Sequence, residues 1–400
     1  MRKLFNFSLL LVLVSMVLAA CGPTAVAQPE ETFKFGMLLV GPYNDRGYSQ
    51  AHYEGGIYVQ EKLAGSEMIY VDKVNPADRP GTTPAQLAED LVSKGAKLII
   101  FNSDDMKDSA LEFAAANPEV MVIHASGDSA WKEGKAYKGL PNMGNIFARM
   151  EYGKMMAGCA AALTTKTGQI GYLGPLINDE TRRLAASAYL GAQHCWTEYL
   201  GNDPADLQFK VTWIGFWFNI PGVTSDPTQV ANDFFNTGYD VVLSGIDTTE
   251  GVTEAKKRAA EGKEVWAIPY DYVGSCEEGQ EICLGVPYFN WGPAYLEALT
   301  AAKSGTWQPS WIWLSPDWKD INNHDSSTIG FVKGQALSSD ASASLDKFIA
   351  ELAGGLNLFS GPLNFQDGST FLTDGQTATD LQVWYLEQLL EGMEGQSVSQ

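Results

Sequence analysis

Histidine is scarce in this chain, and the motifs of familiar hydrolases and nucleotide-binding enzymes are missing. The 400 residues include four histidines, which lie far apart and have no zinc-ligand spacing. There is no phosphate-binding loop of the form Gly-x-x-x-x-Gly-Lys-Ser/Thr, no Gly-x-Ser-x-Gly elbow and no His-Glu-x-x-His motif. The sequence therefore predicts a protein with no catalytic residues, no metal site and no cofactor, which is not an enzyme.

Basic residues are also few. Lys and Arg total 27 against 48 Asp and Glu, which gives a formal net charge of −21 at pH 7. An acidic surface of this kind repels nucleic acids, because their backbones are also negatively charged. We therefore expect no DNA or RNA partner, and we attribute the acidity to solubility outside the cell.

A long apolar run occurs only near the N-terminus. Arg2 and Lys3 precede the run Leu9–Leu18, which is too short to span a bilayer comfortably. Two alanines then lead to Cys21, an order that predicts a signal peptide over residues 1–20. The tetrapeptide Leu-Ala-Ala-Cys matches a bacterial lipobox, so Cys21 is the expected lipidation site. Residues 21–32 would form the lipidated Cys and a tether, which places the protein at the extracytoplasmic face of the cell membrane.

Four cysteines remain after Cys21. Export makes disulfides permissible. Cys276 and Cys283 bracket a turn-like segment, so we expect a local disulfide between them. A bond between Cys159 and Cys195 stays open, because sequence alone does not fix the connectivity.

The rest of the chain alternates two kinds of segment. Short apolar runs, typical of buried strands, cover 33–41, 67–74, 96–102, 120–125, 169–173, 210–215, 240–246 and 264–268. Segments with helical spacing cover 48–63, 84–93, 105–116, 147–163 and 180–199, and a further helix is expected between Asp226 and Gly238. Such alternation is typical of parallel sheets with both faces covered. Because the rhythm restarts after Gly144, the sequence predicts an α/β protein with two doubly wound lobes. The C-terminal part reads as a helix over 344–354, a short hairpin over 359–371 and a last helix over 379–390.

Aromatic and carboxylate side chains gather at the ends of the predicted strands, where ligands bind in open parallel sheets. The faces of Tyr48 and Trp217 suit a flat heteroaromatic ring, and carboxylates and Asn suit ring nitrogens or sugar hydroxyls. Phe216 and Phe218 are expected to pack in the core, because alternate residues of one segment face opposite ways. Asp104 can cap the helix that follows it and still contact a ligand. The ligand-binding candidates from these loops are Tyr43, Asn44, Asp45, Tyr48, Asp104, Trp217, Asp247 and Asp271.

Five stretches of the chain match the motifs of one known family: Gly41–Gln50, Ile123–Gly127, Arg149–Gly153, Thr165–Gly171 and Arg182–Arg183. On these stretches the chain resembles the basic membrane protein family, bacterial lipoproteins that bind purine nucleosides for ABC importers. The resemblance implies that Tyr48 and Trp217 hold the two ring-stacking positions and that Asp271 lies near the family's acidic ligand residue. It also adds Gly127, in the third binding loop, to the candidates.

Two later stretches, Asn290–Pro293 and Phe359–Gly368, look like a branch of that family associated with purine bases such as adenine. Trp291 in the first stretch therefore joins the ligand-binding candidates. The resemblance implies two Rossmann-like lobes with hinge crossovers, as in periplasmic binding proteins of type I. The first lobe would comprise residues 33–142 with about 275–308, and the second 143–274 with about 309–400.

The function implied by the resemblance is capture of a purine nucleoside or nucleobase by hinge closure, followed by delivery to ABC permease subunits. The choice between nucleoside and free base stays open. A sugar-binding protein of the same architecture and a ligand-sensing receptor remain alternatives. A nucleoside hydrolase is a third, although such enzymes usually need a cluster of Asp residues after an N-terminal strand, where residues 41–45 contain a single Asp.

Overall fold

Six strands form the first of two parallel sheets. In the computed structural model, which describes residues 32–398, these strands pair in the order β11-β5-β4-β3-β1-β2. Every neighbouring pair is parallel. The strands are β1 Phe33–Leu38, β2 Ser66–Val71, β3 Ala96–Phe101, β4 Met121–Ala125, β5 Met143–Ala148 and β11 Trp311–Leu314.

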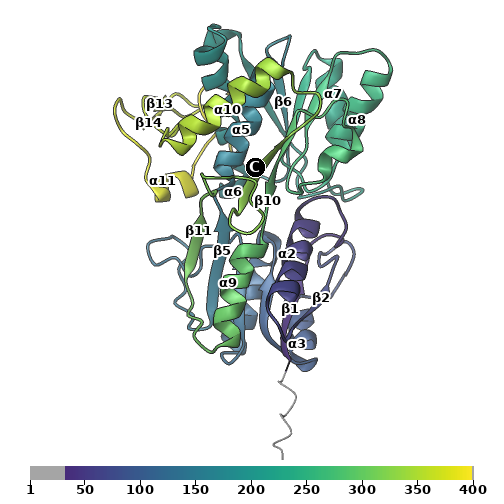
Figure 1. The fold of residues 1–400 in the computed structure, drawn as a ribbon, viewed down its shortest axis with the longest axis vertical. Helices are drawn as coiled ribbons and strands as arrows, with labels where there is room; N and C mark the ends of the chain where they lie inside the picture. The colour runs from purple at the N-terminus through teal and green to yellow at the C-terminus, as the bar shows by residue number, and fades with distance from the viewer. Residues whose placement is uncertain (1–31, 399–400) are drawn as a thin grey trace, which may run out of the picture. The chain divides into compact units, whose positions relative to one another are not determined.

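Helices cover both faces of this sheet. Helix α2 (Tyr48–Lys62) packs with α9 (Gly292–Lys303), and α3 (Pro84–Ser93) packs with α4 (Lys107–Ala116). Phe35 and Met37 of β1 belong to one buried cluster, whereas Leu38 belongs to another that includes residues of α3 and α4. Successive side chains of a strand point to opposite faces, so the apolar run of β1 serves two cores at once. We call this sheet and its four helices the first lobe (Figure 1).

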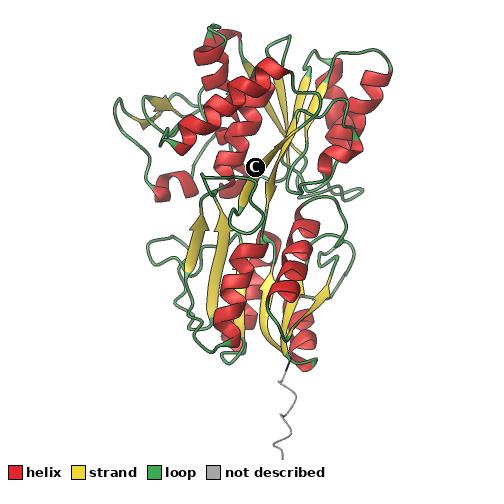
Figure 2. Cartoon of the chain, viewed as in Figure 1, coloured by secondary structure: helices red, strands yellow, loops and turns green. Residues whose placement is uncertain are grey.

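The second lobe repeats this arrangement around a five-stranded sheet with the order β15-β7-β6-β8-β9 (Figure 2). Its strands are β6 Gln169–Gly174, β7 Gln208–Trp213, β8 Val241–Ser244, β9 Trp266–Ile268 and β15 Met393–Glu394. Helices α5 (Met150–Ala162) and α6 (Asp179–His194) pack together, as do α7 (Pro227–Asn236) and α8 (Glu250–Ala260). Ile170 and Leu173 of β6 lie in different buried clusters, which places the two helix pairs on opposite faces.

The chain crosses between the lobes at three places. The first crossing joins β5 to α5 directly. The other two run through β10 (Gly285–Phe289) and β12 (Ile329–Lys333), which pair antiparallel with each other. Helix α5 packs against both of these strands. The predicted hinge crossovers are therefore two paired strands and one short link.

The C-terminal residues complete the second lobe. Helix α10 (Ser339–Ala353) packs on α5, and α11 (Asp380–Trp384) packs on α6. The hairpin of β13 (Leu363–Asn364) and β14 (Thr370–Leu372) lies between these two helices in the sequence, and β15 pairs with β7 at the edge of the sheet.

Three segments differ from the predicted lobe boundaries. Residues 275–284 were expected in the first lobe, but they pack against α8 and bridge to β9 in the second. Residues 143–148 and 311–314 were expected in the second lobe, but as β5 and β11 they pair with the first sheet. Strand β5 was missed because its apolar residues run directly into α5, so the two elements look like one long helix over 147–163. The last helix is also shorter than the predicted 379–390, since α11 ends at Trp384.

Helix boundaries follow the local signals closely. Helix α3 has the predicted bounds. Thr83 is its N-cap and forms a capping box with Gln86, and Pro84 occupies the first helical position. Asp226 caps α7 by accepting a hydrogen bond from the backbone N–H of Thr228, as predicted, and Gly238 beyond its end has a φ of +102°. Ser103, not Asp104, caps the short turn that follows β3.

Residues 32–398 contain two disulfides. Cys276 and Cys283 are bonded with a Cα–Cα distance of 5.6 Å, and Cys159 and Cys195, whose pairing the sequence left open, are bonded at 5.2 Å. The predicted signal peptide, Cys21 and the tether up to residue 31 lie outside the described residues. Within residues 32–398, no helix combines the length and the apolar character that crossing a bilayer requires.

Candidate functional site

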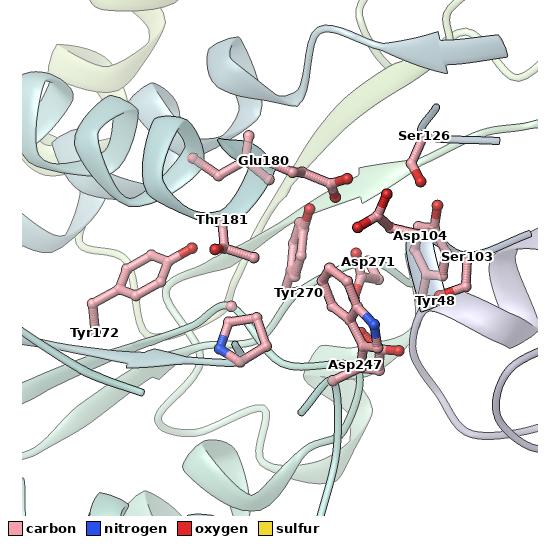
Figure 3. A pocket seen from close by; sticks show the side chains of 14 residues that line it. Tyr48, Ser103, Asp104, Ser126, Tyr172, Glu180, Thr181, Asp247, Tyr270 and Asp271 are labelled. Carbon is pink, nitrogen blue, oxygen red and sulfur yellow. The ribbon is translucent and has the colours of Figure 1, made fainter. Parts of the chain in front are cut away.

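A cavity opens where the carboxyl ends of the two sheets face each other, and its empty space, open solvent at the mouth included, is about 400 Å³. The first lobe contributes the residues after β1, β3 and β4, and the second lobe contributes β6, the start of α6 and the residues after β7, β8 and β9 (Figure 3). The lining residues are Tyr48, Ser103, Asp104, Ser126, Tyr172, Pro175, Glu180, Thr181, Leu184, Trp217, Gly245, Asp247, Tyr270 and Asp271.

The cavity brings together half of the residues proposed from the sequence. Tyr48 and Asp104 come from the first lobe, and Trp217, Asp247 and Asp271 come from the second. The side chains of Tyr48 and Trp217 are each 8% exposed, so these two aromatics are covered by protein on most sides. The rule that ligands bind at the carboxyl ends of parallel strands located all five.

Several buried polar atoms in the cavity lack a hydrogen-bond partner among the described residues. They are the Tyr48 hydroxyl, Ser126 Oγ, Trp217 Nε1 and Asp247 Oδ2. The carboxylate of Asp271 has only the neighbouring Tyr270 side chain beside it as a hydrogen-bonding group. Buried polar groups in folded proteins are nearly always paired, because burying one without a partner costs about 1–3 kcal/mol. A ligand that donates to the carboxylates and accepts from the indole or the hydroxyl would satisfy them together.

Acidic groups dominate the electrostatics of the cavity. Burial raises the pKa of Glu180 to about 8, although the charge of Arg183 opposes this shift. Burial also holds the pKa of Asp247 and of Asp271 well above the usual range, and each feels the negative charge of Asp45 and Glu180 in addition. Because burial disfavours the ionised forms of these acids, a ligand that donates hydrogen bonds to them or carries positive charge would stabilise the ionised forms, so the cavity suits neutral or cationic ligands rich in hydrogen-bond donors.

One buried cation lies behind the acidic groups. Lys154 of α5 donates from Nζ to the backbone oxygen of Ser244 at 2.7 Å and lies 3.1 Å from the ring centroid of Tyr270. Burial lowers the pKa of Lys154 to about 7, against the opposite pull of Asp271. Lys154 therefore only partly offsets the negative charge of the cavity.

The backbone is strained at two positions that line the cavity. Ser126 has a φ of +75° and Asp271 a φ of +72°, in the left-handed region that residues other than glycine rarely adopt. Asp271 is held there by β10, because its N–H donates to the Pro287 oxygen and its own oxygen accepts from Phe289 N. Such strain costs about 1–3 kcal/mol per residue and is concentrated at functional sites.

The two lobes touch around the rim of the cavity. Asn178 Nδ2 of the second lobe donates to Asp104 Oδ2 of the first lobe at 3.3 Å. Ser275 Oγ donates to the backbone oxygen of Arg46 at 2.7 Å, and a side chain at Gly47 would overlap the Asp247 carbonyl group. The absence of a Cβ at Gly47 therefore lets the loops of the two lobes approach closely.

The remaining candidates from the first loop do not line the cavity. Tyr43 is 40% exposed and packs on Tyr53 and Tyr70, and Asn44 is exposed. Asp45 accepts hydrogen bonds from the N–H groups of residues 47, 49 and 50, so it supports the start of α2. Burial raises the pKa of Asp45 to about 6, although these hydrogen bonds lower it.

Gly127 and Trp291 also lie outside the set of lining residues. A side chain at Gly127 would collide with His124 and Asn145, so this position requires glycine for packing. Trp291 is buried and stacks on His52 with ring centroids 4.1 Å apart. Its ring is also edge-on to Tyr48 at 6.0 Å, so it supports the aromatic residue that lines the cavity.

The sequence interpretation did not single out nine of the lining residues: Ser103, Ser126, Tyr172, Pro175, Glu180, Thr181, Leu184, Gly245 and Tyr270. Most of them lie in loops at the carboxyl ends of strands, which the topology rule had indicated as binding loops. The rule therefore predicted these loops correctly but did not identify which of their side chains line the cavity. Tyr172 lies inside β6 and is fully buried, so no sequence signal distinguishes it from a core tyrosine.

Comparisons with known proteins agree with this architecture. Residues 33–310 match the family model Bmp, described as ABC transporter substrate-binding protein PnrA-like. A purine-binding protein of Brucella abortus is 28% identical over 88% of this chain and 91% of its own length. The Haloferax volcanii protein TsgA13, named as a candidate glucose-binding protein of an ABC transporter, is 25% identical over 71% of this chain and 64% of its own length.

Among solved structures, an ABC transporter solute-binding protein of Aeropyrum pernix superposes with a TM-score of 0.63. It is 14% identical and covers 90% of this chain and all of its own, which supports the fold of a type I periplasmic binding protein. The names of these similar proteins describe binding proteins, most of them of ABC transporters, and none describes an enzyme. The chain belongs to the Bmp family of PnrA-like ABC transporter substrate-binding proteins.

Proposed function

We propose that the cavity binds a purine nucleoside or nucleobase between its two lobes. The observation that carries this proposal is the pair Tyr48 and Trp217, aromatic residues from opposite lobes that line one cavity beside buried carboxylates. Aromatic faces bind flat rings, and carboxylates accept hydrogen bonds from ring N–H, amino or ribose hydroxyl groups. The purine-binding relative from Brucella abortus supports the same ligand class.

Capture would proceed by closure of the lobes around the ligand. A ligand that contacts Tyr48 in one lobe and Trp217 in the other binds the closed form better than the open form, and so shifts the population toward it. The closed protein would then deliver the ligand to the ABC permease. Lipidation at Cys21, which would keep the protein at the extracytoplasmic face of the membrane, is part of this proposal.

Sugar binding is the second candidate, and the similarity to TsgA13 favours it. Sugars also stack on aromatic rings and donate hydrogen bonds to carboxylates. A planar base would use two aromatic side chains contributed by different lobes more fully than a puckered sugar ring, which is why we favour the purine.

The test is isothermal titration calorimetry of the purified protein with adenine, adenosine, guanosine, ribose and glucose. We expect saturable binding of at least one purine with a stoichiometry of one. Binding of a sugar in the absence of any purine binding would refute the proposed ligand class and leave the family assignment intact.

A further inference from the structure

The segment that carries Trp217 folds back on itself. Between β7 and α7, residues 214–225 have no regular secondary structure beyond turns, yet Ser225 N donates to the Ile214 oxygen at 2.9 Å and brings the two ends together. Inside the segment, Ile220 N donates to Thr224 Oγ1 at 2.9 Å. A compact surface segment with adjoining ends is an Ω-loop, a type of loop that is frequently functional.

The three consecutive aromatics of this Ω-loop face two different surroundings. Trp217 lines the ligand cavity. Phe216 and Phe218 are half-buried and pack against a cluster of buried residues drawn from the first lobe alone, with their rings 5.0 Å apart and perpendicular. The cluster contains Leu38, Val40, Val74, Ala85, Ala88, Leu91, Ala96, Ile99, Phe101, Met106, Ala110, Phe113, Ala114, Val120, Val122 and Met143.

This packing crosses from one lobe to the other. The Ω-loop belongs to the second lobe through its ends at β7 and α7, whereas the surface that receives Phe216 and Phe218 belongs to the first. The backbone of Trp217 is also fixed on the second-lobe side, because Asp247 N donates to the Trp217 oxygen at 2.9 Å. Trp217 is thus held between a hydrogen bond to one lobe and two aromatic contacts with the other.

We propose that Phe216 and Phe218 are positioning residues that seat Trp217 against the ligand by packing into the core of the first lobe. The inference rests on the proposed function and extends it, since it makes ligand affinity depend on an apolar contact outside the cavity. The two side chains contribute this contact only when the lobes are together. Ligand stacking and lobe closure are therefore coupled through adjacent residues of one loop.

The experiment compares the double variant Phe216→Ala/Phe218→Ala with the wild type by calorimetry, using each compound of the purine and sugar panel that the wild type binds. We expect about tenfold weaker affinity, because Trp217 would lose the support for a stacking contact of the strength typical of base–aromatic pairs. Phe216→Leu/Phe218→Leu, which keeps an apolar contact, should restore most of the affinity. In a Trp217→Ala background the same Phe substitutions should weaken affinity by a smaller factor than they do in the wild type, because the part of the effect that acts through Trp217 is already lost.

The matched control is Phe235→Ala, because Phe235 is also half-buried but packs only against clusters of the second lobe. It should lower thermal stability without changing affinity. Unchanged affinity in the double variant, or an equal loss in the Phe235 control, would overturn the inference. If the wild type binds a sugar alone, the purine proposal fails while the loop is still tested with that sugar.

A second measurement decides the case in which no compound of the panel binds. Small-angle X-ray scattering of the ligand-free proteins should then give a larger radius of gyration for the double variant than for the wild type, because the contact between the lobes is lost. Equal radii would overturn the inference.

Discussion

At the scale of single residues, the two cavity aromatics make the most direct prediction. Replacing Tyr48 or Trp217 with Ala should each weaken purine binding by about 1–3 kcal/mol, the usual strength of base–aromatic stacking. Calorimetry with the best purine of the panel measures this loss. Tyr43→Ala is the control, because Tyr43 lies in the same first loop as Tyr48 but outside the cavity, and its affinity should match the wild type. Unchanged affinity in both cavity variants would remove these residues from the site.

Glu180 predicts a pH dependence of stability. Its pKa rises from an ordinary 4.5 to about 8 on folding, so the folded state keeps a proton that the unfolded state has already lost between these values. Stability from this group is present at pH 4.5 and is lost as the pH rises toward 8, by up to about 1.4 kcal/mol per pH unit. Glu180→Gln mimics the protonated form, so it should gain stability relative to the wild type as the pH rises.

Urea denaturation of the ligand-free wild type and the Glu180→Gln variant at pH 5, 6, 7 and 8 measures this difference. Glu261→Gln is a control at an exposed carboxylate at the end of α8, and its curve should stay parallel to the wild type. A Glu180→Gln curve that is also parallel would show that Glu180 does not titrate in this range.

At the scale of elements, the disulfide between Cys159 and Cys195 links the end of α5 to the end of α6. These helices pack along most of their length, and the bond closes a loop with a sequence separation of 36. Replacing both cysteines with Ala should lower the free energy of unfolding by about 4 kcal/mol, whereas the shorter loop of Cys276 and Cys283, with a separation of 7, should lose about 2 kcal/mol. Chemical denaturation under oxidising conditions compares the two variants, and the reverse order would contradict the loop-length argument.

Local signals located most elements from the sequence, but they failed where two elements adjoin. Helix α3 was predicted residue by residue, because Thr83 and Pro84 mark its start and Gly95 follows its end. Strand β5 was not predicted from the sequence, because only Arg149 separates β5 from α5 and both elements are buried. Burial on all sides removes the contrast between apolar and polar positions on which periodicity depends.

At the scale of the whole molecule, the close approach of the lobes at Gly47 makes a prediction about closure. A Cβ at Gly47 would overlap the Asp247 carbonyl group, and overpacking of this kind costs about 1–3 kcal/mol. Gly47→Ala should therefore weaken ligand affinity by about 5- to 150-fold with little change in the melting temperature of the ligand-free protein. Calorimetry and thermal melting together separate the two effects.

The control is Gly251→Ala, where a Cβ would lie at an ordinary 3.6 Å from Val242 Cγ1 inside the second lobe. It should leave affinity unchanged. Wild-type affinity for Gly47→Ala would mean that the ligand-bound lobes are farther apart than in the structure described.

The sequence predicted which loops form the candidate site better than it predicted which side chains of those loops line the cavity. The strand-end rule indicated the loops of Tyr48, Asp104, Trp217, Asp247 and Asp271, because parallel strands bring their carboxyl ends to one edge. It also indicated Tyr43, Asn44 and Asp45, which do not line the cavity, because the rule selects a loop and not the side chains within it. It did not reveal the left-handed backbone of Asp271, which depends on the distant strand β10.

The order of the sheets has a consequence for how the chain is made. The first sheet is complete only when β11 (residues 311–314) has paired with β5. The second sheet is complete only when β15 (residues 393–394) has paired with β7 and covered its edge. During synthesis the chain therefore exposes the edge of β5 until residue 314 has emerged and the edge of β7 until residue 394 has emerged. Exposed edges invite pairing with other chains, so truncation near the C-terminus should promote aggregation even though it leaves every residue of the cavity in place.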